Sequence, residues 1–327
     1  MPKRAQRGKR VGDGGGDYCR MSKVRELMRT LIVYGRSQAD AVSLLLNYAP
    51  HISASFRICY VSAFDELPSV GVPMVASEIA APEDVVSAAL LFEQRGRNSF
   101  PLRHLLPADC VTVTFPSIEF NLLWPLSCTN PFNDEGNPEF PFGHYPYGDR
   151  VIVEGVQHGL DADEILAHYF SVGAAYLPNM DHFYRIELAR LTALEAPCDV
   201  KMADFAFASM RTERLFWTYN HPAMPPLREL IRRLLQHAGA FYPELLAPEI
   251  DESIAGWYQP EGPLNMMRVP IHPGIVEHWG LDWCRMPDDA AAYGYANNPM
   301  NYRDYFADMV HRSISVRDAE GPQNAAS

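Results

Sequence analysis

Short apolar runs alternate along the chain with stretches whose apolar residues recur every three or four positions. The runs Leu31–Tyr34, Phe56–Val61 and Cys110–Phe115 are rich in β-branched and aromatic residues, which is typical of buried strands. Gln38–Leu46 instead carries its apolar residues on one helical face. This alternation predicts an α/β fold, with a mainly parallel sheet flanked by helices on both faces.

Later segments continue the alternation. Arg150–Glu154 (RVIVE) predicts a possible fourth strand, and Leu215–Tyr219 (LFWTY) predicts a late strand. The late strand leads into a helix whose leucines share one face as far as Gly239. The other predicted helices are Pro82–Glu93, Asp161–Phe170, His182–Leu194 and Tyr305–Arg312.

These segments predict one α/β domain over residues 23–312. Its core is expected in residues 30–240, followed by an irregular or helical extension over 241–312 that is richer in Pro, Trp and Tyr. The first ten residues carry five Lys/Arg and precede a glycine-rich spacer, so residues 1–22 are expected to form a disordered tail. Residues 313–327 are expected to be a frayed tail.

Charge and cysteine content exclude several classes of protein. The formal net charge of -12 argues against a nucleic-acid partner. No apolar run approaches the ~20 residues of a membrane span, and no apolar segment follows the basic start, so neither membrane insertion nor secretion is expected. The six cysteines are scattered, which favours free thiols in a reducing cytoplasm. The eleven histidines form no HxxxH or HExxH pair, so no metal is expected.

The first candidate site is the turn Gly35-Arg36-Ser37-Gln38 between the first strand and the first helix. Ligands of open parallel sheets bind beyond the carboxyl ends of the strands, which is where this turn lies. The free N–H groups of the following helix could hold an anion or an oxyanion there, and Ser37 could act as a nucleophile beside a base. The alternative is that Ser37 only caps the helix.

Two further stretches could supply the other groups. The aromatic loop Phe140–Asp149 (FPFGHYPYGD) contains His144 and Asp149, and it suits a binding site better than a core. Asn220 and His221 follow the late strand, where Asn220 could donate an amide hydrogen bond and His221 could act as a base or ligand. The structural alternatives are a packed surface loop for the first stretch and a helix cap with a packed histidine for the second.

A fourth pattern is Asp308-Met-Val-His311. This DxxH spacing occurs near the C-terminus of GDS(L)-type serine esterases, where it supplies the acid and base of the triad. Within a helix, however, residues i and i+3 share a face merely by periodicity. The pattern keeps a serine esterase of SGNH type as an alternative, which requires both residues beside Ser37.

Taken in order, these motifs resemble a known family. GRSQ after the first strand, GHYPYGD in the middle loop and LFWTYNHP before a helix are followed by IHP at 271–273 and GLDW at 280–283. Together they resemble the WcbI-type polysaccharide biosynthesis family over about residues 30–285. The pattern associated with that family is GNCQ, GYHPD and TxNHP. Here Arg36 and Ser37 stand where that pattern has Asn and Cys, and the middle loop reads HYP rather than YHP.

The resemblance implies an SGNH- or flavodoxin-like three-layer fold and an O-acyltransferase that uses coenzyme A or acetyl-CoA. The acceptor would be a glycan or nucleotide sugar in capsular or surface polysaccharide biosynthesis. Carried onto this chain, Gly35, Arg36 and Gln38 would bind the cofactor. Ser37, His221, His144 and Asn220 would form the catalytic group, with either histidine as the base.

The loss of the family's cysteine also permits a non-catalytic protein that binds CoA or a nucleotide. Arg150, Arg185, Lys201, Arg211 and Arg214 are further anion-binding candidates.

Overall fold

The computed structural model describes residues 28–63, 81–96, 99–134, 140, 142–246, 261–284 and 290–320. Its central sheet has four parallel strands in the order β2-β1-β3-β4. They are β1 (Arg29–Gly35), β2 (Phe56–Ser62), β3 (Ala88–Arg95) and β4 (Val111–Pro116). The predicted α/β fold with a parallel sheet is therefore confirmed. The predicted tail at residues 1–22 lies outside the described residues.

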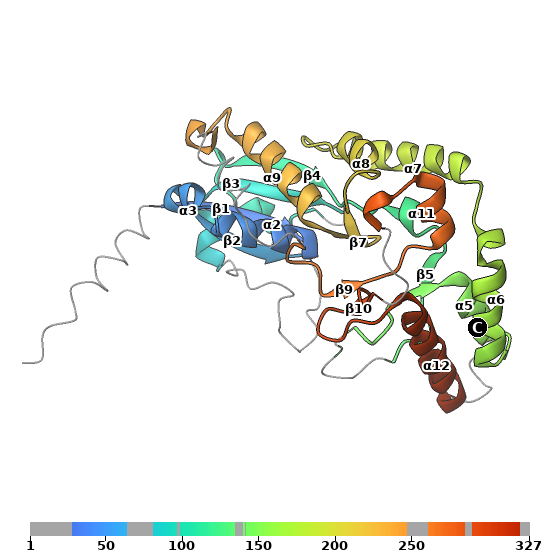
Figure 1. The fold of residues 1–327 in the computed structure, drawn as a ribbon. Coiled ribbons are helices and arrows are strands. Elements are labelled where there is room, and N and C mark those ends of the chain that lie inside the picture. The colour runs from blue at the N-terminus through green and yellow to red at the C-terminus, as the bar shows by residue number, and fades with distance from the viewer. Residues whose placement is uncertain are drawn as a thin grey trace, which may run out of the picture.

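Helices cover both faces of this sheet because successive side chains of a strand point to opposite sides. Leu31 and Val33 of β1 belong to the large core shared with α2 (Ser37–Asn47), α3 (Pro50–Ser55) and α9 (Met224–Ala238). Ile32 and Tyr34 face the other way and pack in a smaller core with Val85 of α4 (Pro82–Val86). Figure 1 shows α9 crossing one face of the sheet beside α2.

Two predicted elements are wrong. The expected helix Pro82–Glu93 ends at Val86, and Ala88–Arg95 is strand β3 at the centre of the sheet. This strand is buried on both faces, so its sequence lacks the alternation that marks a half-exposed strand. The expected strand Arg150–Glu154 is part of helix α5 (Arg150–Gln157), because the Asp149 carboxylate accepts the Val151 N–H and caps the helix.

The remaining elements surround one end of the sheet. The strand pairs are β5 (Ser127–Thr129) with β6 (Tyr147–Asp149), β7 (Phe216–Thr218) with β8 (His221–Pro222), and β9 (Met267–Arg268) with β10 (Gly294–Tyr295). The helices are α6 (Ala162–Val172), α7 (Met180–Glu195), α8 (Ala203–Ser209), α11 (Pro273–Trp279) and α12 (Tyr302–Glu320). Buried side chains of α5, α6 and α12 form a second core, and Figure 1 shows these helices standing together.

Helix α12 reaches further than the sequence pattern indicates. The stretch 313–320, expected to be frayed, is helical, and Arg317 donates to the carbonyls of Val156 and Leu160. This contact with the end of α5 gives the last turns of α12 a tertiary partner. Residues 321–327 lie outside the described part of the chain.

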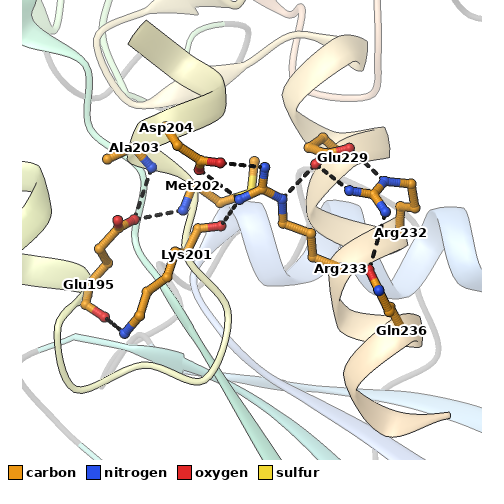
Figure 2. A network of polar contacts seen from close by, with 9 residues as sticks. All are labelled: Glu195, Lys201, Met202, Ala203, Asp204, Glu229, Arg232, Arg233 and Gln236. Carbon is orange, nitrogen blue, oxygen red and sulfur yellow. Dashed lines mark hydrogen bonds and ion pairs between the residues drawn. The ribbon is translucent and has the colours of Figure 1, made fainter. Parts of the chain in front are cut away.

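The turn between α7 and α8 is stabilised by reciprocal capping, which Figure 2 shows. The buried Glu195 carboxylate accepts the N–H groups of Met202 and Ala203, at 2.6 and 2.9 Å, where α8 begins. Lys201 donates back to the last carbonyls of α7. Arg233 of α9 then bridges to Asp204 of α8 at 2.7 and 2.9 Å. These contacts hold the helix that carries one wall of the site described below.

Candidate functional site

A pocket of about 720 Å³ opens where β1, β3 and β4 end. Its lining includes Gly35 and Arg36 from the end of β1 and Arg95 from β3, and Arg190 comes from α7. The size is typical of a small-molecule site, and the carboxyl edge of a parallel sheet is the expected place for one. Three arginines line it beside one acid, Glu119; Arg190 is paired with the Glu187 carboxylate, so Arg36 and Arg95 carry the positive charge that favours an anionic ligand.

The arginines differ in how they are held. Arg190 is anchored by two hydrogen bonds to Glu187 and one to the carbonyl of Glu119. The Nε atom of Arg95 is buried and has no hydrogen-bond partner among the described residues. A buried donor without a partner is costly, so a ligand that accepts a hydrogen bond from it would be stabilised.

Helix α2 begins at the wall of this pocket. Arg36 is its N-cap residue and supplies no side-chain cap, and Ser37 is the first helical residue. The Ser37 hydroxyl therefore does not serve as the N-cap, which was the alternative role considered from the sequence. Ser37 is partly exposed and lies between Arg36, which lines the pocket, and the buried Gln38. The N–H groups of the first helical turn have no intrahelical partners and can bind negative charge.

Two buried glutamines join this turn to the neighbouring loops. Gln94 of β3 accepts the N–H of Arg36 at 2.8 Å, and its amide donates to Gln38 at 3.1 Å. Gln38 in turn donates to the carbonyls of Ile118 and Asn220, at 2.7 and 2.8 Å, and accepts the Ile118 N–H. All four hydrogen-bonding positions of the Gln38 amide are thus used within the protein. The contacts assign it to positioning the loops around the pocket.

Asn220 has an oriented side chain. Its Oδ1 accepts from the hydroxyls of Thr218 and Tyr147, at 2.9 and 3.1 Å, so the amide NH₂ is the end left to donate elsewhere. Because the Asn220 carbonyl also bonds to Gln38, this amide lies on the segment tied to the start of α2. The Asn220 amide and the N–H groups at the start of α2 are the kinds of donor that stabilise an oxyanion.

His221 follows Asn220 and packs edge-on against the Tyr147 ring at 5.9 Å. Its Nδ1 is buried and has no hydrogen-bond partner among the described residues. Desolvation lowers the pKa of this imidazole to about 4. His221 is therefore neutral at pH 7, which is the form a general base requires.

The lowered pKa of His221 predicts a loss of stability in acid. Between pH 6.5 and about 4 the unfolded chain binds a proton at this residue and the folded chain does not, so stability falls as the pH is lowered through this window. Between pH 7 and pH 4 the free energy of unfolding, measured in urea, should fall by about 2–3 kcal/mol less in His221→Gln than in the parent protein. The exposed His158 provides the control, because His158→Gln should follow the parent. Identical acid dependence in parent and His221→Gln would contradict the prediction.

His144, the other candidate base, lies elsewhere. It lines a separate pocket with Asp308 and Arg312 that shares no lining residue with the arginine pocket. Its Nδ1 approaches the Asp134 carboxylate to 2.5 Å. The loop continues to Tyr147, whose hydroxyl reaches Asn220. Neither histidine is among the lining residues of the arginine pocket, but the residue before His221, Asn220, is hydrogen-bonded to Gln38 at the start of α2, and no such bond ties His144 to that turn.

The contacts of α12 do not assemble an esterase triad. Asp308 accepts from the Tyr145 hydroxyl at 2.6 Å and from Arg312 at 2.8 Å, while His311 is exposed on the helix surface. Neither residue lines the pocket beside Ser37. Their i, i+3 spacing is the ordinary consequence of helical periodicity.

The sequence missed most of the pocket's cations. Among the five basic candidates, Lys201 caps α7, and Arg214 is held between the Trp217 and Trp283 rings, with centroids 4.7 and 4.9 Å away. None of the five lines the arginine pocket. Arg95 escaped notice because its strand resembles a helix. Arg190 sits on a polar helix face, where no local signal distinguishes it.

Neither a cysteine nor a metal-ligand cluster is found at the arginine pocket among the described residues. The lining residues of the arginine pocket include no cysteine. Burial raises the pKa of Cys110, Cys128 and Cys198 to about 11, so these thiols are protonated at pH 7. Within the described residues, no three His, Cys, Asp or Glu side chains gather as a metal site would require. Nor does any described helix have the length and apolarity to cross a bilayer.

Fold and pocket together define an α/β protein with an anion-favouring ligand site at the carboxyl edge of its parallel sheet. The family model described as "Polysaccharide biosynthesis enzyme WcbI" matches residues 30–241, and the chain belongs to this family. The resemblance drawn from the sequence motifs is confirmed.

A solved structure shares the fold. It is described as WcbI, a novel polysaccharide biosynthesis enzyme, in its native form without a disulfide bond between coenzyme A and a cysteine of that protein. The TM-score is 0.64 at 19% sequence identity, over 90% of this chain and 92% of that one. A comparison with curated proteins gave no significant match.

Proposed function

We propose that this protein transfers an acyl group, such as acetyl, from coenzyme A to a sugar hydroxyl in polysaccharide biosynthesis. The observation that supports this most is the arginine pocket at the start of α2. Coenzyme A carries a pyrophosphate and a further phosphate, and Arg36 and Arg95 offer cations for them, with the Glu187-paired Arg190 beside them. The solved structure of similar fold is described with coenzyme A, which agrees with the proposal.

The chemistry assigns a role to each neighbouring group. An acceptor hydroxyl attacks the thioester carbonyl, and its proton passes to the neutral His221 imidazole. The N–H groups at the start of α2 and the Asn220 amide hold the oxyanion. The intermediate then expels the coenzyme A sulfur, which receives the proton from His221. Ser37 either carries the acyl group between two such steps or orients the acceptor hydroxyl.

Calorimetric titration with coenzyme A and acetyl-CoA tests the binding half of the proposal. We expect Arg36→Ala to weaken binding by about tenfold, or ~1.4 kcal/mol, because it removes a cation from the pocket. The matched control is Arg232→Ala, since Arg232 lies on α9 and pairs with Glu229 outside the pocket. Absence of binding to the folded parent protein would refute the proposal.

Release of free thiol from acetyl-CoA, measured with a panel of nucleotide sugars and neutral oligosaccharides, tests the transfer half. Ser37→Ala should retain coenzyme A binding and lose transfer by at least ~100-fold. Binding without turnover by the parent across the panel would favour a non-catalytic coenzyme A-binding protein instead. Full activity of Ser37→Ala would remove Ser37 from the mechanism.

A further inference from the structure

The pocket around His144 is separate from the arginine pocket and has different lining groups. It has a volume of about 150 Å³, room for about five water molecules at ~30 Å³ each. Its lining combines the aromatic rings of Phe140 and Tyr295 with the polar groups of His144, Asp308 and Arg312. An aromatic wall with a few converging polar groups is typical of a small-ligand site.

The loop that carries His144 is held in place by side chains on its backbone. Asn133 donates to one backbone carbonyl of the loop and accepts one N–H, at 2.6 and 2.9 Å, on either side of His144. Asp134 accepts the His144 N–H at 2.8 Å, and the Tyr295 hydroxyl donates to the Gly143 carbonyl at 2.6 Å. A loop fixed in this way places its side chains without further ordering cost, which favours binding.

The His144 ring is also oriented. It packs on the Phe140 ring with centroids 3.8 Å apart, and its Nδ1 lies 2.5 Å from Asp134. That contact leaves the Nε2 side of the ring directed away from Asp134. The Nε2 atom has no hydrogen-bond partner among the described residues and is not among the buried atoms. Nε2 is therefore a polar atom at the pocket wall with which a ligand hydroxyl can form a hydrogen bond.

The charges in this pocket select against an anion. Arg312 donates to Asp308 at 2.8 Å and lies 3.6 Å from Asp134, so two carboxylates offset its single positive charge. What the pocket offers instead is the His144 Nε2 atom and the Asp308 carboxylate beside the Phe140 and Tyr295 rings, which meet edge-to-face with centroids 4.7 Å apart. A ring with hydroxyl donors on its edge and an apolar C–H face matches these groups.

We propose that this pocket binds one neutral pyranose unit of the acceptor glycan. The C–H face of the sugar packs on the Phe140 ring beside Tyr295, and its hydroxyls form hydrogen bonds with His144 Nε2 and donate to the Asp308 carboxylate. The proposal rests on the proposed function only for the class of ligand, a sugar. The loop that lines this pocket also carries Tyr147, whose hydroxyl donates to Asn220.

Saturation-transfer NMR of the full chain with neutral methyl hexopyranosides, including 6-deoxy and N-acetyl forms, tests this site. The matching methyl uronides serve as anionic counterparts. We expect at least one neutral glycoside to bind, with affinity weakened by about tenfold in both Phe140→Leu and His144→Gln. Phe140→Leu keeps apolar volume but removes the ring, and His144→Gln removes the ring nitrogen. The exposed His158→Gln serves as the control and should bind as the parent does.

Each result decides the inference separately from the proposed function, because coenzyme A is titrated into the same samples. Coenzyme A binding with no response to any neutral glycoside would overturn the sugar site alone. Glycoside binding that both pocket variants retain, or a preference for the uronides, would also overturn it. Glycoside binding lost in the variants, without coenzyme A binding, would support the sugar site and refute the transferase.

Discussion

Replacing Gly35 by alanine is expected to destabilise the protein by about 2–5 kcal/mol, a large part of the ~5–15 kcal/mol that stabilises a typical domain. Gly35 has φ +154°, a backbone conformation that residues with a Cβ rarely adopt. An added Cβ would also lie 2.5 Å from Gln94 and 2.7 Å from Ala39. The strain of the turn and the displacement of Gln94 act together, because Gln94 also accepts the Arg36 N–H.

Urea unfolding of three alanine variants separates these causes. Gly159 has φ +74° and open space around its Cβ position, so Gly159→Ala carries strain without overlap. Gly96 lines the same pocket as Gly35 and has nothing within 4 Å of that position, so Gly96→Ala should change stability least. The expected order of destabilisation is Gly35, Gly159, Gly96. A Gly35→Ala variant no less stable than Gly159→Ala would contradict the overlap with Gln94.

The second large effect is expected at Gln38, where Gln38→Leu should cost about 3–4 kcal/mol. The side chain is 3% exposed and makes four hydrogen bonds. Leucine fills much of the space but leaves the carbonyls of Ile118 and Asn220 and the Ile118 N–H without this partner. Each buried polar group left unpaired costs roughly 1–3 kcal/mol, offset in part by the greater apolar burial of leucine.

Because Gln38 joins Asn220 to the start of α2, the same variant should also disturb the site. Coenzyme A binding is expected to weaken in Gln38→Leu even at temperatures where the protein remains folded. Asn47→Ala provides the control on the same helix, since it removes a single bond to Ser43 on a partly exposed surface. Unfolding curves and calorimetric titrations of both variants make the comparison. A Gln38→Leu variant as stable as Asn47→Ala would refute the positioning role.

Short-range pattern was sufficient for much of the fold. The strands β1, β2 and β4 and the helices α2, α6, α7 and α9 all lie where the hydrophobic periodicity predicted them. The turn from Gly35 to Gln38 at the carboxyl end of β1 was equally visible, because a buried strand followed directly by a helix start is written in adjacent residues. The family was also recognisable from the order of its motifs.

Periodicity failed where burial on both sides removes it. β3 is apolar on both faces, so Ala88–Arg95 could not be told from a helix until its two parallel neighbours were known. α5 has the β-branched composition of a strand, and only the capping Asp149 and the packing of α5 against α6 and α12 decide its conformation.

What the sequence by itself determined is strands β1, β2 and β4, the helices α2 and α9 that pack on them and the turn that begins α2, since each is marked by a pattern within a few neighbouring positions. Tertiary structure alone decided that Arg95 and Arg190 join Arg36 around one pocket, and that Asn220 bonds to Gln38 in this turn while His144 faces a different pocket. These residues are tens of positions apart. Their meeting depends on how strands and loops pack, and no local pattern records that packing.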